Sequence, residues 1–155
     1  MRITLGSRTI VIHSGVKKIL LDFAQHGPTQ PEAGGIILGK LIEQEIHAMK
    51  ISAPSSLDKS SRFSFERHKL SAQIVIDFEF LNSGGETVYL GEWHTHPEKN
   101  PNPSSTDSKM VRTQYREIER PTDFLILLIQ GTESLFAGLY DGHNFESCLV
   151  PNEDM

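Results

Sequence analysis

The sequence contains a single cysteine, Cys148, among its 155 residues. One cysteine cannot form an internal disulfide, and it cannot build a zinc site that needs several thiolates. We expect Cys148 to be a small apolar side chain of the last strand. So little cysteine also favours the reducing environment of the cytoplasm over an oxidising compartment.

Long hydrophobic runs and an excess of positive charge are also missing. No apolar stretch approaches the roughly 20 residues needed to cross a bilayer. Arg2 and Arg8 interrupt the apolar residues of the N-terminus, which argues against a signal peptide. The chain has 15 Lys and Arg against 20 Asp and Glu, and its positive residues are scattered. Because such a balance does not suit a protein that coats phosphates, we predict neither a membrane nor a nucleic acid as partner.

Length and composition fit one globular domain. Apolar residues make up 37% of the chain and charged residues 23%. A chain of this length can bury a core without disulfide or metal support. We place the domain at residues 1–150 and predict that residues 151–155 form a flexible tail.

Hydrophobic periodicity and turn residues predict a mixed α/β fold with a central mixed sheet. Apolar residues from Val16 to Ala24 recur with helical spacing after Ser14, which we expect to be the N-cap, and Gly27-Pro28 ends this helix. A later helix is predicted to start at Ser104 or Ser105 and to stop at Pro121. The predicted strands cover residues 9–13, 33–42, 45–53, 87–96, 124–129, 135–140 and 145–150.

Residues 70–81 fit two different periods. Ile74, Ile76 and Phe78 alternate with other residues as in a strand, whereas Leu70, Ile74 and Phe78 line one face of a helix. Short apolar runs of this kind are not settled by period alone. We prefer the helix, partly because of the family resemblance that the motifs below establish.

The most informative stretch is His94-Thr95-His96, followed further along by Asp107. Side chains of a strand alternate between its faces, so both histidines project to the same side, about 7 Å apart along the strand, while Thr95 points away. The connector that follows is rich in Pro and Asn and turns the chain back toward the histidines. Two imidazoles and one carboxylate are the ligand set of a catalytic zinc site with one open position. We therefore predict one Zn²⁺ held by His94, His96 and Asp107.

Ser104 and Asp107 also have a purely structural interpretation. Ser-x-x-Asp at a helix start resembles a capping box, with an acidic group in the first turn, where the helix dipole favours it. A histidine pair by itself is weak evidence as well, because exposed strands carry such pairs without a metal. The occurrence of both motifs at this spacing in one chain is what favours a metal site.

A hydrolytic zinc site also needs a carboxylate that accepts and relays the proton of the attacking water. Glu32 is the candidate, because it precedes a Gly-rich apolar strand whose glycines let another backbone approach closely. Glu92 lies on the same strand face as both histidines and is interpreted as a carboxylate that supports a ligand or faces solvent. The residues alone do not decide among Glu32 and its competitors Glu43, Glu45, Glu86, Glu92 and Glu98.

The upstream motif Glu32-x-x-Gly-x-x-Leu-Gly and the downstream motif His94-x-His96-Pro-x6-Ser104-x-x-Asp107 together resemble the JAMM motif of the MPN/JAB-domain metalloproteases. The order of the predicted elements extends the resemblance over nearly the whole chain. It implies a single MPN/JAB domain, whose central sheet is similar to that of cytidine deaminases and is flanked by helices. In this family the histidines and the aspartate hold zinc, the glutamate moves the proton of the catalytic water, and the serine stabilises the oxyanion.

The resemblance implies hydrolysis of an amide, with Glu32 and Ser104 as catalytic residues. The family favours isopeptide or peptide bonds that follow the extended C-terminal tail of a ubiquitin-like protein. Residues 54–61, rich in Ser, Asp and Lys, are expected to be a surface loop. The segment 54–65 is interpreted as an exposed edge at which the tail of a protein substrate adds as a strand.

Two biological uses of bacterial relatives stay open. One group works beside ubiquitin-transfer-like conjugating enzymes in anti-phage systems that signal with cyclic oligonucleotides (CBASS), and it removes a conjugated protein from its targets. The other trims sulfur-carrier proteins in cysteine or cofactor synthesis. We prefer the first, because a bare catalytic domain needs partners to supply specificity.

Three further alternatives concern the class of protein. A non-catalytic module that keeps zinc for stability would not require Glu32 or Ser104. A cytidine-deaminase-like hydrolase expects Pro-Cys-x-x-Cys, which the single Cys148 cannot provide. A DNA-repair relative of the same fold is disfavoured by the acidic charge balance and by the motif around Glu32.

Overall fold

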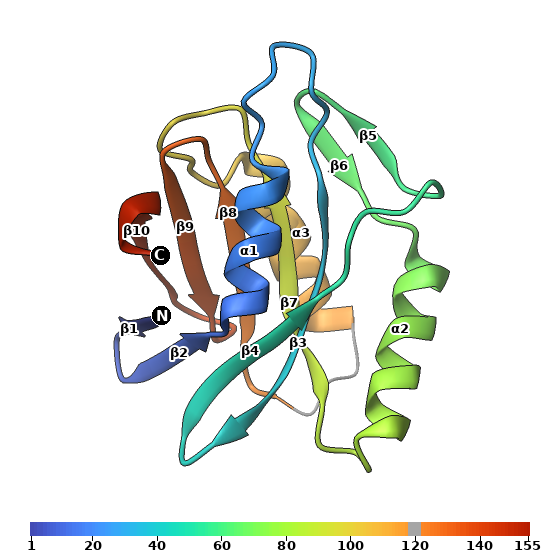
Figure 1. Ribbon diagram of the computed structural model, residues 1–155. Coiled ribbons are helices and arrows are strands. Elements are labelled where there is room, and N and C mark those ends of the chain that lie inside the picture. The colour runs from blue at the N-terminus through green and yellow to red at the C-terminus, as the bar shows by residue number, and fades with distance from the viewer. Residues whose placement is uncertain (118–121) are drawn as a thin grey trace.

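The apolar stretches predicted as strands pair into one mixed sheet with helices on both faces (Figure 1), in a computed structural model that describes residues 1–117 and 122–155. The sheet has the strand order β1-β2-β4-β3-β7-β8-β9-β10, and β5 and β6 form a separate hairpin. The strands are β1 Arg2–Leu5, β2 Arg8–Ile12, β3 Gly34–Ile42, β4 Glu45–Ile51, β5 Lys59–Ser61, β6 Ser64–Glu66, β7 Val88–Thr95, β8 Leu125–Gln130, β9 Ser134–Tyr140 and β10 Phe145–Pro151. The helices are α1 Ser14–Phe23, α2 Lys69–Asn82, α3 Ser105–Glu117 and the 3-10 helix η1 Asn152–Asp154.

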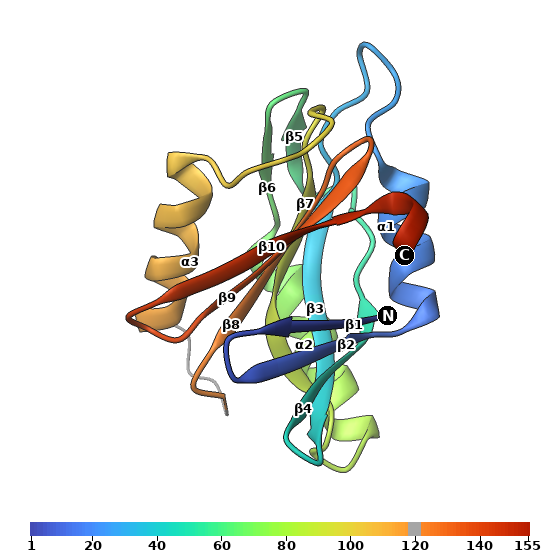
Figure 2. The ribbon, with the colours of Figure 1, turned by 90° about the vertical axis from the view of Figure 1, so that its left-hand side faces the viewer.

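The centre of the sheet is formed by β3, β7 and β8. β3 pairs antiparallel with β4 and β7, and β7 pairs parallel with β8. All six residues of β8 are buried, as expected for a strand covered on both faces. The edges of the sheet approach each other, because β1 contacts β9 and β10 (Figure 2). This confirms the predicted mixed α/β class.

The helices divide between the two faces of the sheet, with α1 on one side and α3 on the other (Figure 2). Val16 and Leu20 of α1 belong to the core cluster that contains the fully buried Trp93. On the opposite face, Ala72 of α2 and Val111 of α3 pack in two smaller clusters. Truncating a buried tryptophan such as Trp93 to alanine costs about 3–5 kcal/mol. Cys148 packs against this core as a partly buried apolar residue, as predicted.

The prediction of a helix over residues 70–81 is confirmed by α2. The apolar stripe that suggested the helix does not face the sheet, however. Leu70, Ile74, Phe78 and Leu81 are 60–75% exposed, and Ala72 is the buried residue that α2 contributes. The helix, which lies at one side of the sheet in Figure 1, therefore exposes these four apolar side chains.

The ends of α1 differ from the prediction by local chemistry. His13 is the N-cap and Ser14 is the first helical residue. The helix ends at Phe23 rather than at Gly27-Pro28, because Gln30 donates from its side-chain amide to the backbone carbonyls of Phe23 and Ala24. Those carbonyls have no partner within the helix, so a side chain from beyond the helix satisfies them.

Two segments expected to lack structure contain it. Residues 59–61, part of the predicted surface loop, form β5 and pair with β6. The predicted flexible tail also differs from the structure: Pro151 ends β10, and the next three residues form η1. Asn152 accepts a hydrogen bond from the buried Gln130 amide at 2.8 Å and donates to the carbonyl of Thr132 at 3.1 Å. Met155 packs against the main core.

The strand β1 was not predicted. Buried and exposed residues alternate in β1, but the strand has only four residues. Two of these, Arg2 and Thr4, are polar, so the remaining two apolar residues are too few to indicate a strand. Gly6, with a φ of 56°, makes the turn into β2. The predicted helix stop at Pro121 lies outside the described residues. Among the described helices, none is long and apolar enough to cross a membrane.

Candidate metal centre

His94 and His96 are positioned by the end of β7. Trp93 and Thr95 point to the α1 face of the sheet, so both histidines point to the opposite face, as the alternation of a strand predicts. Both imidazoles are buried, at 4% and 8% exposure. Thr95 accepts from the backbone N–H of Ala33 at 2.9 Å and donates to the side chain of Gln25 at the same distance. The first bond fastens the chain just before β3 to the end of β7, and the second ties the end of β7 to the segment that follows α1.

Asp107 is positioned by the first turn of α3. Its Oδ2 accepts from the backbone N–H and from the hydroxyl of Ser104, both at 2.7 Å, and the Ser104 hydroxyl accepts from the N–H of Asp107 at 3.1 Å. Ser104 and Asp107 therefore form the hydrogen bonds of a helix cap, as the structural interpretation of Ser-x-x-Asp predicts. It orients the carboxylate toward the histidines and is compatible with a role as a metal ligand.

The connector between the histidines and α3 is held against the turn between β8 and β9. The carbonyls of Glu98 and Lys99 accept from the backbone of Thr132 and Glu133 at 2.8 and 3.1 Å. Gly131 lies so close to Pro101 that a Cβ there would come within 2.5 Å of the proline ring. A side chain at position 131 would push the connector away, so this glycine is required by close packing.

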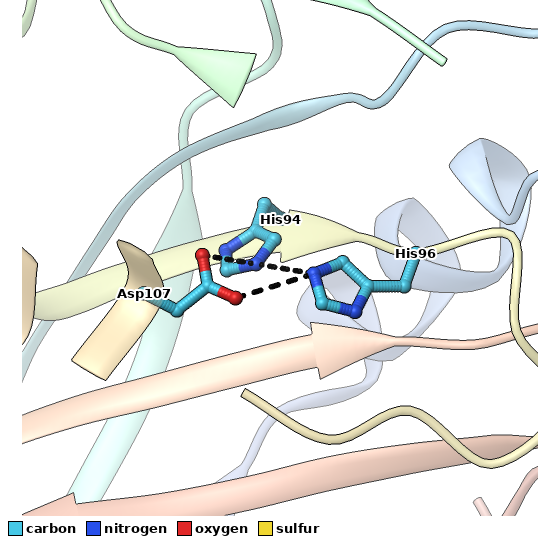
Figure 3. Close-up of side chains that lie close together, drawn as sticks. All are labelled: His94, His96 and Asp107. Atoms are coloured by element: carbon cyan, nitrogen blue, oxygen red, sulfur yellow. Dashed lines mark hydrogen bonds and ion pairs between the residues drawn. The ribbon is translucent and has the colours of Figure 1, made fainter. Parts of the chain in front are cut away.

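The three predicted ligands converge on one point (Figure 3). His94 Nε2 and His96 Nε2 are 3.1 Å apart. His94 Nε2 lies 3.3 Å from Asp107 Oδ1, and His96 Nε2 lies 3.4 Å from Asp107 Oδ2. Ligand atoms at zinc bond lengths of about 2.0–2.1 Å and tetrahedral angles are roughly 3.3–3.4 Å apart. The two distances to Asp107 involve its two different oxygens, one of which would be the ligand. The donor types and the close spacing suit a cation of the size of Zn²⁺ with a further position left open.

The charges of the centre suit a cation. Burial raises the pKa of Asp107, but the hydrogen bonds from His94, His96 and Ser104 lower it more, so its pKa is well below the usual range. Burial lowers the pKa of His96, yet its hydrogen bond to Asp107 and the charges of Asp107, Glu32 and Glu98 leave it raised. Asp107 is accordingly ionised at neutral pH, as a metal ligand must be.

Glu32 lies opposite His96 across the end of the β3–β7 pair. Gly34 pairs with His94 in this antiparallel ladder, and the N–H of Thr95 donates to the carbonyl of Ala33 at 2.8 Å, which continues the register toward Glu32. The Glu32 side chain is buried, and burial raises its pKa to about 7, while the nearby His96 opposes the rise. A carboxylate with a pKa near the working pH is suited to accept and return a proton.

The β5–β6 hairpin holds Glu32 from the other side. The N–H of Glu32 donates to the carbonyl of Ser61 at 2.8 Å, and the hydroxyl of Ser60 donates to the carbonyl of Glu32. Phe65 lies over Gly34, where any Cβ would approach the ring to 2.5 Å. A glycine beside His94 therefore lets the hairpin sit close to the metal centre.

Other glutamates that compete with Glu32 in the sequence have different surroundings. Glu45 pairs with Arg2, and Glu86 pairs with Lys40 at 2.8 Å. Glu98 is exposed and lies 3.6 Å from Nδ1 of His96. Glu92 does not face solvent, because it is buried and accepts from Arg67 and from the hydroxyl of Tyr89.

A cleft of about 640 Å³ opens beside the metal centre. β6 forms one wall with Ser64 and Phe65, and α3 forms the other with Met110 and Gln114. Glu92, Trp93 and His94 of β7 line its floor, and Asp107 also borders it. The cleft thus reaches His94 and Asp107, two of the three predicted ligands.

Comparison with known proteins agrees with this geometry. Residues 14–138 match the model of a family described as prokaryotic homologs of the JAB domain. The chain belongs to this family. A solved structure from Desulfitobacterium hafniense shares the fold of this JAB chain, with a TM-score of 0.59 at 17% identity over 90% of this chain and 89% of the other. The prediction of an MPN/JAB domain is thereby confirmed.

Several relatives of this JAB chain carry names that describe an activity. A protein of Vibrio cholerae named CD-NTase/cGAS isopeptidase is 34% identical over 129 residues, which cover 83% of this chain and 80% of that protein. One of the same name from Pseudomonas aeruginosa is 34% identical over 152 residues, covering 95% and 93%. A probable metalloprotease of Sinorhizobium fredii is 33% identical over 107 residues, covering 66% and 65%.

Sequence reasoning did not find all residues that shape the JAB site. Gln25 lies far from the motif in sequence, and only the fold brings its side chain to Thr95. Gly131 carries no chemical signal apart from its lack of a side chain. Arg67 follows β6, and its partner Glu92 is visible in the sequence only as one glutamate on the histidine face of β7.

Proposed function

We propose that this chain is a zinc-dependent isopeptidase or peptidase, which hydrolyses the amide bond after the extended C-terminal tail of a conjugated protein. The observation that carries the proposal is the convergence of His94, His96 and Asp107, at separations of 3.1 to 3.4 Å, beside a buried glutamate whose pKa is about 7. The isopeptidase and metalloprotease names of relatives in the same family support this class of reaction.

His94, His96 and Asp107 would hold the ion, which when bound supplies a Lewis acid for the scissile carbonyl and makes water more acidic. Glu32 accepts one proton from the attacking water. As the carbon–nitrogen bond breaks, Glu32 returns that proton to the leaving amine, so that the products are a neutral amine and a carboxylic acid, which loses its own proton to solvent at neutral pH. Support for this role comes from the backbone register, which sets Glu32 opposite His96 at the end of the β3–β7 pair.

Ser104 is proposed to stabilise the oxyanion. Its hydroxyl proton is directed at Asp107 Oδ2, so the hydroxyl must turn toward the substrate to donate there. Ser104 would keep the backbone N–H bond to Asp107 during this rotation. Oxyanion donors of this kind contribute about 100- to 1,000-fold in rate.

The cleft beside β6 suits an extended chain. β5 is engaged with Glu32 through Ser60 and Ser61, whereas no other strand pairs with β6 within the described part of the chain. A tail that added along β6 would run over the floor of β7 toward His94. The names of the relatives favour a conjugated CD-NTase over a sulfur carrier as the protein that supplies this tail.

The test uses the purified chain and a CD-NTase of the same bacterium fused through its C-terminus to a fluorescent protein. We expect one zinc per chain and cleavage directly after the CD-NTase tail. Chelation should abolish cleavage, and zinc should restore it better than magnesium, which prefers six oxygen ligands. A chain that binds zinc but leaves this fusion and ubiquitin-like fusions intact would instead support a non-catalytic module.

A further inference from the structure

Arg67 lines the cleft, and its guanidinium binds Glu92 of β7. Glu92 lies two residues before His94, the first of the predicted metal ligands. The Nε of Arg67 donates to both carboxylate oxygens of Glu92, at 2.8 and 2.9 Å. The side chains of this pair are only 15% and 7% exposed. The Tyr89 hydroxyl lies 2.7 Å from the Glu92 carboxylate and 2.8 Å from the side chain of Gln114 in α3. The Arg67–Glu92 pair is therefore linked through Tyr89 to α3.

Arg67 retains donors that its neighbours do not use. A guanidinium carries five N–H groups. Glu92 takes the one on Nε, and the Tyr89 oxygen lies close enough to interact with another. Among the described residues, no further acceptor is hydrogen-bonded to Arg67. Arg67 lines the cleft, so its remaining terminal N–H groups are the donors that it can offer to a bound chain there.

The backbone of Arg67 is fixed on both sides. Glu66 is the last residue of β6, and the N–H of His68 donates to Asp58 at 2.7 Å. His68 then caps α2 by accepting from the N–H of Ser71. With its backbone anchored and its Nε engaged, the guanidinium presents a fork of fixed direction, which lowers the entropy lost on binding.

The position of Arg67 relative to the ligands defines what it could reach. Glu92 precedes His94 by two residues, which is about 7 Å along a strand. A second cleft of about 420 Å³, between α2 and α3, also has Arg67 in its lining, so the guanidinium stands where the two clefts meet. An extended chain whose scissile carbonyl lies at the ligands would pass Arg67 with its second or third residue from that bond.

We propose that Arg67 binds a main-chain carbonyl of the substrate tail, two or three residues before the scissile bond. The assignment rests on the proposed function and names the contact that sets the register of the tail. The charge of Arg67 is balanced by Glu92, so the fork favours a neutral carbonyl oxygen over an acidic side chain. Glu92 is in turn a positioning residue, because it directs the fork without touching the substrate.

Replacing Arg67 would impair the enzyme even if its role were only to stabilise the fold. The test therefore changes the substrate as well as the enzyme. The probe is the CD-NTase–fluorescent protein fusion, assembled by peptide ligation with one amide of the tail replaced by an alkene that lacks the carbonyl. Three positions are compared: the second and third residues before the scissile bond, and the sixth as a control. With wild-type enzyme, one of the first two replacements should raise KM about 10- to 100-fold, the range for a hydrogen bond to a charged group, with little change in kcat.

The enzyme variants complete a double-mutant cycle. In Arg67→Met/Glu92→Gln no buried charge is left unpaired, and the sensitive alkene should change KM less than threefold. Arg67→Lys keeps the charge but lacks the forked pair of donors, so the alkene should raise its KM much less than that of wild type. This variant serves as the test if the double variant does not fold. Arg8→Lys alters another paired guanidinium, held to Asp123 at 2.7 and 2.9 Å on an exposed surface, and should behave as wild type.

Equal alkene effects in wild type and in the Arg67 variants, or none at either position in wild type, would overturn the assignment of Arg67 and leave the proposed function standing. Failure of the wild-type enzyme to cleave the unmodified fusion would overturn the proposed substrate class and this contact with it.

Discussion

Glu32 and His96 face each other across the end of the β3–β7 pair, fastened there by the hydrogen bonds between Ala33 and Thr95. The relationship brings a residue from before β3 to the histidine pair of β7, although more than sixty positions separate them in sequence. It places a buried carboxylate with a pKa of about 7 near the cluster of His94, His96 and Asp107, of which Glu32 is not a member.

Replacement of Glu32 by glutamine should preserve metal binding and abolish turnover. The amide keeps the size of the side chain but cannot accept the proton, so kcat should fall by about 100- to 10,000-fold. Zinc content by mass spectrometry and kcat on the fusion substrate measure the two effects. Glu86→Gln, which alters an exposed partner of Lys40, is the control. If Glu32→Gln cleaves at the wild-type rate, the assignment of the base is wrong.

The same substitution should stabilise the metal-free protein at alkaline pH. Burial raises the pKa of Glu32 to about 7 from 4.5, so the folded state holds the proton more tightly than the unfolded state. The penalty is absent below pH 4.5, grows as the pH rises toward 7, and is complete above it. After allowing for solvent screening, Glu32→Gln should gain about 1 kcal/mol at pH 8, or about 2–4 °C in Tm. The gain should vanish near pH 4.5, and a gain independent of pH would contradict burial of the carboxylate as its cause.

Ser104 has two roles that different substitutions separate. Ser104→Ala removes the cap and should cost about 0.5–2 kcal/mol of stability, whereas Ser104→Gly should cost only a few tenths. Both lack the hydroxyl, so both should lose about 100- to 1,000-fold in kcat. Thermal unfolding and steady-state kinetics on the two variants provide the comparison. Wild-type turnover in Ser104→Gly would restrict this residue to the cap.

Thr95→Val should impair the enzyme without removing a ligand or the base. The substitution keeps the shape of a fully buried side chain but leaves the N–H of Ala33 and the amide oxygen of Gln25 without this partner. Unsatisfied buried groups cost about 1–3 kcal/mol, and Glu32 follows the displaced backbone. We expect lower stability in denaturant and a lower kcat at unchanged zinc content. A normal kcat would mean that the hairpin alone positions Glu32.

Strand addition along β6 predicts a period of two in the substrate. Alternate N–H groups of an added strand face its partner, so N-methylation at successive tail positions should raise KM strongly and weakly in turn. Equal effects at successive positions would contradict strand addition. Deleting residues 55–60 of the enzyme is less selective. That deletion also removes the contacts of Ser60 with Glu32 and of Asp58 with His68, so kcat should fall as well as KM rise.

The convergence of His94, His96 and Asp107, the predicted metal ligands, followed from the sequence because strand alternation and helix capping are local rules. His94 and His96 needed only the period of a strand, and Asp107 needed only its place in the first turn of a helix. Glu32 could not be separated from competing glutamates by such rules, since its place depends on the register between β3 and β7. Family resemblance supplied what local reasoning left open.

The period of an element could be read from the sequence, but the face that it buries depends on where the core lies, which the sequence does not give. The period of α2 was correct, but its apolar stripe points outward, because the small Ala72 allows close packing on the opposite side of the helix. The hairpin β5–β6 escaped prediction because its three-residue strands are polar and mostly exposed. Its stability comes from Phe65 packed over Gly34, a contact between distant segments.

The hydrogen bonds that hold the connector to the turn at Gly131 affect how the folded chain would respond to loss of a metal ion. Since Glu98, Lys99 and Asp107 are anchored by the polypeptide itself, little chain entropy has to be surrendered when an ion arrives. If the proposed function holds, an ion can leave and return while the fold stays intact, so that a shortage of metal would stop turnover reversibly without unfolding the protein.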